Sequence, residues 1–124
     1  MNSTPSPPAI RIVLLSGPRL GDGIAVPPQG AFIGRSRGSL IGLDREVHKL
    51  VSGHHLAITF EGGWWAEDLK STNGTWRNGV RLAERSQIAP DDEFELGRPG
   101  LEGTLRFYVT FVDQRRALFG VADA

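Results

Sequence analysis

Residues 68–79 have the sequence Asp68-Leu-Lys-Ser-Thr-Asn-Gly-Thr-Trp-Arg-Asn-Gly79, which contains two Asn-Gly pairs separated by three residues. Asn-Gly is the strongest short-range signal for a β-hairpin, because both residues tolerate the positive φ angles of a two-residue turn. Three residues cannot supply strands for two tight hairpins. Asn78-Gly79 is the better candidate, because strand-like segments flank it on both sides. Asn73-Gly74 is then expected in a loop that ends a strand over residues 64–69.

Short strands are expected along most of the chain. Residues 56–61 and 104–112 alternate apolar and polar side chains, the pattern of a strand with one buried face. Sixteen glycines and eight prolines interrupt the chain often, and no segment keeps the 3.6-residue period of a long helix. The expected strands cover residues 10–15, 24–26, 31–34, 40–43, 56–61, 64–69, 75–77, 80–82, 93–96 and 104–112. The predicted fold is an all-β sandwich of about ten or eleven short strands.

The length of 124 residues predicts a single domain, and the hydrophobic content of 40% is enough for one core. We expect a flexible N-terminal tail at 1–8, a folded domain at 9–113 and a C-terminal tail or linker at 114–124. The formal net charge of zero argues against broad attraction to nucleic acid or to anionic membranes. The N-terminus lacks the basic and apolar regions of a signal peptide, which predicts a cytoplasmic protein.

Candidate catalytic and metal-binding patterns are weak. The chain has no cysteine and three histidines, so a zinc site lacks ligands and thiolate chemistry is excluded. Neither a nucleophile elbow nor a phosphate-binding Gly-x-x-x-x-Gly-Lys loop is present. The acids at 91–93 are typical of a turn that leads into a strand, and His55 is typical of a buried histidine that holds neighbouring backbone. We therefore expect no catalytic residue, no metal and no cofactor.

Several short motifs occur in a fixed order: Gly34-Arg35, Ser52-Gly-His-His55, Ser71-Thr-Asn-Gly-Thr75, Asn78-Gly79 and Gly97. Each motif alone is weak, but the ordered set over residues 9–113 resembles the forkhead-associated (FHA) domain. This family has an FHA/SMAD-like β-sandwich that binds phosphothreonine peptides through loops at one end. The resemblance implies a phosphothreonine-dependent interaction module in serine/threonine kinase signalling, rather than an enzyme.

The resemblance also implies a role for each matching residue. Arg35 would bind the phosphate, and the Ser52 hydroxyl would donate to a phosphate oxygen. Thr72 would line the pocket and Asn73 would hold the peptide main chain, with Gly53 beside them in the binding set. The positions that would support the site are Gly34, His55, Gly74, Asn78 and Gly79. A guanidinium suits this task because it meets phosphate with two parallel hydrogen bonds.

Three positions depart from the family pattern. Gly53 stands where a basic or polar residue often follows the serine, Leu56 replaces the usual alanine after the histidine, and an acid is missing near Ser39. Arg37, Arg45 and Lys49 are candidates to supply the charge that Gly53 lacks.

The expected partner is a threonine-phosphorylated protein, either a kinase or a kinase substrate, bound by a monomer that contacts neither nucleic acid nor membrane. The alternative function is a scaffold that docks a protein without phosphate, which the absent side chain at Gly53 favours. A hydrolase is a third reading, but no nucleophile has a recognisable activating neighbour.

Overall fold

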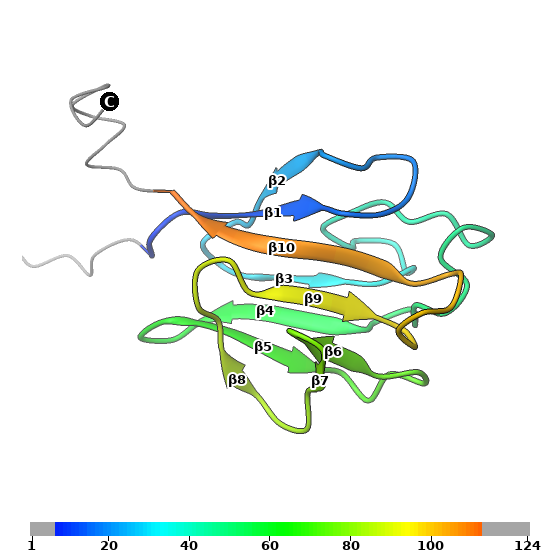
Figure 1. The fold of residues 1–124 in the computed structure, drawn as a ribbon. Helices are drawn as coiled ribbons and strands as arrows, with labels where there is room; N and C mark the ends of the chain where they lie inside the picture. Colours follow the sequence, from blue (N-terminus) through cyan, green and yellow to red (C-terminus); the bar gives the residue numbers. More distant parts are fainter. Residues whose placement is uncertain (1–6, 113–124) are drawn as a thin grey trace, which may run out of the picture.

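The structure is a computed structural model that describes residues 7–112. The described residues form ten strands and no helix, arranged as two antiparallel sheets that pack face to face (Figure 1). The strands are β1 (Ile10–Leu14), β2 (Gly23–Ala25), β3 (Ala31–Ile33), β4 (Leu56–Phe60), β5 (Trp64–Asp68), β6 (Thr75–Arg77), β7 (Val80–Arg81), β8 (Ser86–Gln87), β9 (Glu93–Leu96) and β10 (Leu105–Phe111). One sheet has the order β2-β1-β10-β9-β6-β7, and the other has the order β3-β4-β5-β8. The predicted all-β sandwich is confirmed.

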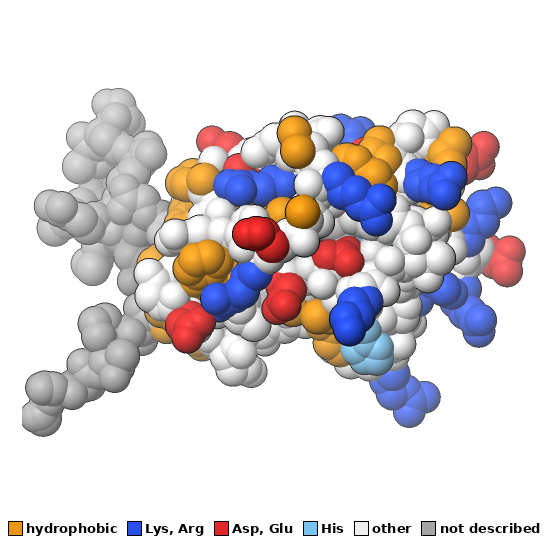
Figure 2. Space-filling view, turned by 90° about the horizontal axis from the view of Figure 1, so that it is seen from below, with side chains coloured by type: hydrophobic (Ala, Val, Ile, Leu, Met, Phe, Trp, Pro, Cys, Tyr) orange, Lys and Arg blue, Asp and Glu red, His pale blue; other side chains and the backbone are white. Residues whose placement is uncertain are grey.

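Besides the β1–β2 connection at 15–22, strand direction places three loops at the same end of the sandwich, away from the ends of the described chain (Figure 1). These are the β3–β4 connection at 34–55, the β5–β6 loop at 69–74 and the β9–β10 loop at 97–104. We call them the end loops. Several Lys and Arg side chains project from this end in the view from below (Figure 2).

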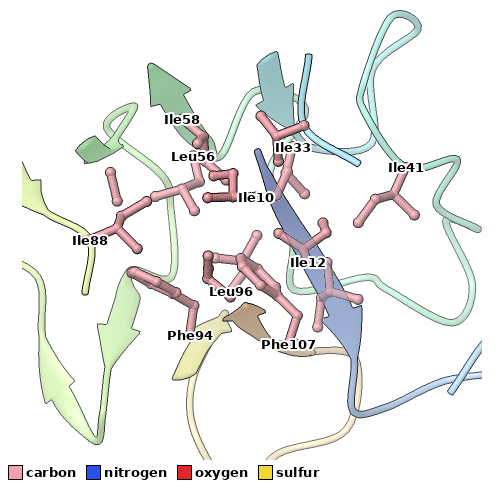
Figure 3. Packing of buried hydrophobic residues seen from close by; sticks show 14 of the residues in the cluster. Ile10, Ile12, Ile33, Ile41, Leu56, Ile58, Ile88, Phe94, Leu96 and Phe107 are labelled. Carbon is pink, nitrogen blue, oxygen red and sulfur yellow. The ribbon is translucent and has the colours of Figure 1, made fainter. Parts of the chain in front are cut away.

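The core lies between the two sheets and follows from the alternation in the sequence (Figure 3). In β10 every second residue from Leu105 to Val109 is buried, and in β1 Ile12 is fully buried where it pairs with Val109. The rings of Phe94 and Phe107 stack with centroids 5.5 Å apart. Burial of this apolar surface is the main term that stabilises the sandwich.

The hairpin at 78–79 forms as the turn chemistry predicts. Strands β6 and β7 pair with only Asn78 and Gly79 between them, at φ angles of 50° and 84°. Two successive positive φ angles are typical of the turn that matches the twist of a hairpin. Asn73 and Gly74 instead lie in the loop that follows β5, as expected.

Two details differ from the sequence prediction. The predicted strand at 40–43 is wrong: Ile41 is buried, but the segment is irregular and its backbone reaches β3 through a single bond, from the Leu40 N–H to the Phe32 carbonyl. Strand β8 was not predicted, because Ser86 and Gln87 are polar and pair with β5 through backbone groups alone. The predicted tails at 1–8 and 114–124 lie almost wholly outside the described residues.

Candidate functional site

Backbone hydrogen bonds join the end loops into one surface. Within the β3–β4 connection, the Arg35 N–H donates to the Ser52 carbonyl at 3.0 Å. The Leu50 N–H donates to the Gly103 carbonyl at 2.9 Å, and the Gly97 N–H donates to the Gly74 carbonyl at 2.9 Å. Each loop is therefore bonded to at least one other, and side chains on all of them can act on one ligand.

Arg35 follows directly on β3 and is half-buried. Its Nε donates to the carbonyl oxygen of Val51, a residue that is only 1% exposed. Neither terminal nitrogen of the guanidinium has a hydrogen-bond or ion-pair partner among the described residues. The hydrogen bond at Nε thus holds the guanidinium in place and leaves its two terminal nitrogens available to an anion.

Ser52, Thr72 and Asn73 are brought together with the backbone that holds Arg35. The Ser52 Oγ accepts a hydrogen bond from the Thr72 N–H at 3.0 Å, and its own proton has no acceptor among the described residues. The Asn73 Nδ2 donates to the Leu50 carbonyl at 3.1 Å, which leaves its side-chain oxygen without a described partner. A hydroxyl donor and an amide acceptor therefore flank the chain segment to which Arg35 is tied.

The His55 side chain links the β3–β4 connection to the β5–β6 loop. Its ring is fully buried, its Nδ1 accepts from the Ser52 N–H at 3.0 Å, and its Nε2 donates to the Gly74 carbonyl at 2.7 Å. Burial lowers the pKa of His55 below its ordinary value, although the Gly74 carbonyl and Asp68 act in the opposite direction. The ring is therefore neutral at physiological pH, with its proton on Nε2.

Asp68 organises the β5–β6 loop, a role that the sequence analysis missed. Its carboxylate accepts from the hydroxyls of Ser71 and Thr75, both at 2.6 Å, and from the Ser71 N–H at 3.0 Å. Burial alone would raise the pKa of Asp68, but these hydrogen bonds outweigh it and lower the pKa. An Asp at a strand end with Ser three residues later is a local turn pattern that could have revealed this network.

Acid is expected to destabilise the domain in two steps. Unfolded His55 takes up a proton near its ordinary pKa of 6.5, whereas folded His55 resists protonation, so the unfolded state binds more protons and stability falls below that pH. His48, whose pKa burial also lowers, acts in the same window. Asp68 has its folded pKa below 3.8, so a second loss is expected as the pH falls through about 4.

The measurement is the urea midpoint as a function of pH, followed by tryptophan fluorescence. The variant His54→Gln changes an exposed neighbour and should keep the same decline. A midpoint that stays constant from about pH 8 to about pH 5 would contradict the neutral, buried state of His55.

Gly34 and the Asn78-Gly79 pair, which were expected to support the site, lie in different parts of the fold. A Cβ on Gly34 would lie 1.9 Å from the Gly53 carbonyl oxygen, so only glycine fits between the two chain segments. Asn78 and Gly79 do not touch the end loops through any described hydrogen bond. Asn78 binds Asp92 and Glu93 at 2.9 Å each, which fixes β6 against the start of β9.

Gly53 lies beside the Ser52 hydroxyl and has no positive φ. Its N–H donates no hydrogen bond to a described residue, so the backbone can still contribute a donor. A Cβ at this position would lie 2.6 Å from the hydroxyl oxygen of Ser36, a group that can rotate away. The structure therefore has room for the side chain that this sequence lacks.

The FHA resemblance implies a phosphate beside Ser52, so a lysine introduced at Gly53 is expected to increase phosphopeptide affinity by about threefold to tenfold through a second cation. Isothermal titration with one phosphothreonine peptide measures the change. The matched control is Gly53→Ala, which displaces Ser36 without adding charge and should give no gain. Equal affinities for the lysine and alanine variants would show that position 53 is remote from the phosphate.

Replacing Asn73 with alanine is expected to lower phosphopeptide affinity at least tenfold while costing only about 0.5–1.5 kcal/mol of stability, the value of its bond to Leu50. Asn78→Gly is the matched control, because glycine keeps the positive φ but loses the bonds to Asp92 and Glu93. That variant should lose stability and keep affinity. Calorimetric titration combined with thermal melts separates the two, and the opposite pattern would reverse their assigned roles.

The described residues contain no helix long and apolar enough to cross a membrane. Within the same part of the chain, no three His, Cys, Asp or Glu side chains are grouped as a metal site would require.

The FHA domain model matches residues 31–97, which include every residue assigned to the site. Among solved structures, the FHA domain of an Arabidopsis thaliana hypothetical protein is 30% identical, with a TM-score of 0.70 and coverage of 91% of this chain and 93% of that one. The FhaA FHA domain, solved with the intracellular domain of Rv3910, is 27% identical, with a TM-score of 0.65 and coverage of 81% and 98%.

A third structure, described as an analysis of phosphothreonine-dependent FHA domain interactions, is 25% identical, with a TM-score of 0.69 and coverage of 85% of this chain and 98% of that one. No curated protein sequence matches the chain. The match to the FHA model over more than half of the sequence, together with these structures, shows that this chain belongs to the FHA-domain family.

Proposed function

We propose that this FHA domain is a phosphothreonine-dependent protein interaction module in serine/threonine kinase signalling. The observation that carries the proposal is the tethered guanidinium of Arg35, whose Nε is bound to the Val51 carbonyl while both terminal nitrogens stay open. A guanidinium held in this way loses little freedom when it binds, so more of the interaction energy appears as affinity.

Each group around Arg35 has a matching group on a phosphothreonine peptide. The phosphate carries a charge of about −1.5 to −2 at neutral pH and offers oxygens to the guanidinium and to the Ser52 hydroxyl. The amide of Asn73 can accept from and donate to a peptide main chain, once a ligand competes with the Leu50 carbonyl. We infer that Thr72, which is exposed and whose N–H is bonded to the Ser52 hydroxyl, lines the pocket beside the phosphothreonine.

The comparisons support this reading, since one similar FHA structure comes from work on phosphothreonine-dependent interactions and another holds an intracellular domain as its partner. We infer that the partner here is a threonine-phosphorylated kinase or kinase substrate. We infer further that the domain is non-catalytic, acts as a monomer in the cytoplasm, and uses no cofactor, nucleic acid or membrane.

A second candidate function is a scaffold that binds its partner without phosphate. The observation in its favour is Gly53, which removes a side chain that could have contacted the phosphate. The two functions differ in whether phosphorylation of the partner matters.

An oriented peptide library tests the proposal, with every sequence present in phosphothreonine and unphosphorylated form. The expected result is enrichment of phosphorylated sequences alone, and loss of that enrichment with Arg35→Ala. Equal capture of both forms would support the scaffold function and contradict phosphate-dependent binding.

A further inference from the structure

Most cations outside the end loops already have a partner. Arg19, Arg77, Arg85 and Arg106 each pair with a carboxylate, and Arg81 lies over the Trp76 ring at 5.4 Å, whereas Arg11 on β1 forms no ion pair with a described residue. Six Lys and Arg residues of the end loops form no ion pair with any carboxylate of residues 7–112. These six are Arg35, Arg37, Arg45, Lys49, Lys70 and Arg98.

The same loops carry a local charge that the neutral whole chain conceals. Against the six cations stand three acids, Asp44, Glu46 and Glu102, although the formal net charge of the chain is zero. One acid is already engaged, because Asp44 accepts the N–H groups of Glu46 and Val47 at 2.7 and 3.2 Å. Five of the six cations are exposed, and Lys and Arg side chains project from this end in Figure 2.

A positive surface of this kind attracts a negative partner and raises the association rate. Of the six cations, only Arg35 is tied by a hydrogen bond to the segment that carries Ser52, and the side chains of the other five form no hydrogen bond with any described residue. They are therefore available to residues on either side of the phosphothreonine. Each exposed contact is weak alone, but several acting together are worth about tenfold in affinity.

We propose that the ligand of this domain is an acidic phosphopeptide, with carboxylates or a second phosphate flanking the phosphothreonine. This rests on the function proposed above and names the class of ligand for the same site. Nucleic acid is disfavoured, because the end loops contain no Phe, Tyr or Trp on which a base could stack, and acids are interspersed with the cations.

The test compares four phosphothreonine peptides that differ only in their flanks: neutral, Asp/Glu-rich, carrying one added phosphoserine, and Lys-rich. At about 50 mM NaCl the acidic or doubly phosphorylated peptide should bind about tenfold more tightly than the neutral one. At about 500 mM NaCl this advantage should shrink to less than about threefold. The larger of the two gains shows whether carboxylates or phosphate supply the charge.

Substitutions of the end-loop cations identify which residues are responsible for the preference for acidic peptides. Each of Arg37→Gln, Arg45→Gln, Lys49→Gln, Lys70→Gln and Arg98→Gln should weaken acidic-peptide binding, and their combination should remove the advantage. The pair Lys70→Gln and Arg98→Gln lies outside the predicted phosphate-binding residues and should narrow the advantage while neutral-flank phosphothreonine binding persists. Arg11→Gln is the matched control, because Arg11 is also exposed and unpaired but lies on β1. It should leave all four affinities unchanged.

Equal affinity for the neutral and acidic peptides would overturn the inference and leave phosphate recognition intact, since both carry phosphothreonine. A single-stranded oligonucleotide that displaces the acidic peptide at equal concentration would also overturn it. Failure of the proposed function looks different, because no peptide would then bind in a phosphate-dependent way and Arg35→Ala would have no effect.

Discussion

Gly34→Ala is expected to cost about 3 kcal/mol of stability, the upper end of the usual range for an overpacked site. The added Cβ would lie 1.9 Å from the oxygen and 2.6 Å from the carbon of the Gly53 carbonyl, and 2.9 Å from the Ser52 carbonyl oxygen. All three atoms belong to the backbone, so no side chain can rotate to relieve the clash. The segments at 34–36 and 52–53 must separate.

That separation would also remove binding. The N–H groups of Arg35 and Ser36 donate to the carbonyls of Ser52 and Gly53, and these bonds hold the backbone of Arg35 against that of Ser52. Gly42→Ala is the control, because Gly42 is exposed and a Cβ there has nothing within 4 Å. Urea unfolding measures both variants. Nearly equal midpoints for Gly34→Ala and Gly42→Ala would contradict the close approach of the two segments.

Arg35→Ala is expected to eliminate detectable phosphopeptide binding without unfolding the domain. Hydrogen bonds to charged groups are worth roughly 1.5–3 kcal/mol each. Loss of the guanidinium should therefore lower the affinity at least tenfold, and by up to about a hundredfold. Arg35→Lys keeps the positive charge but loses both the paired geometry and the Nε bond to the Val51 carbonyl. It should therefore bind much more weakly than the wild type.

The sequence predicted the fold well where side chains alone decide it. Alternating apolar residues identified β4 and β10, and the Asn78-Gly79 pair identified the β6–β7 turn, because both signals depend on local chemistry. The segment at 40–43 shows the limit of that approach: Ile41 is apolar because it is buried, yet it is buried in a loop. Strand β8 had no signal, since its two polar residues form a strand only through the backbone of β5.

The candidate site could be predicted from the family resemblance as a set of residues but not as an arrangement. The motifs named Arg35, Ser52 and Asn73, whereas their anchors are the carbonyls of Val51 and Leu50 and the N–H of Thr72. Backbone groups carry no sequence signature, so the tether that fixes the guanidinium is visible only in three dimensions. The structure was also needed to show which Lys and Arg residues form ion pairs with carboxylates, because composition gives only the net charge of the chain.

The measurement that tests the central claim most directly is calorimetric titration of the wild type, Arg35→Lys and Arg35→Ala with three matched peptides: phosphothreonine, phosphoserine and unphosphorylated. We predict that the wild type binds phosphothreonine most tightly, because the extra methyl group adds about 1–3 kcal/mol in a small apolar pocket, and that it ignores the unphosphorylated peptide. Arg35→Lys should retain only weak binding, and Arg35→Ala none. Wild-type binding of the unphosphorylated peptide with equal affinity, or unchanged binding by Arg35→Ala, would contradict the account and identify the domain as a scaffold.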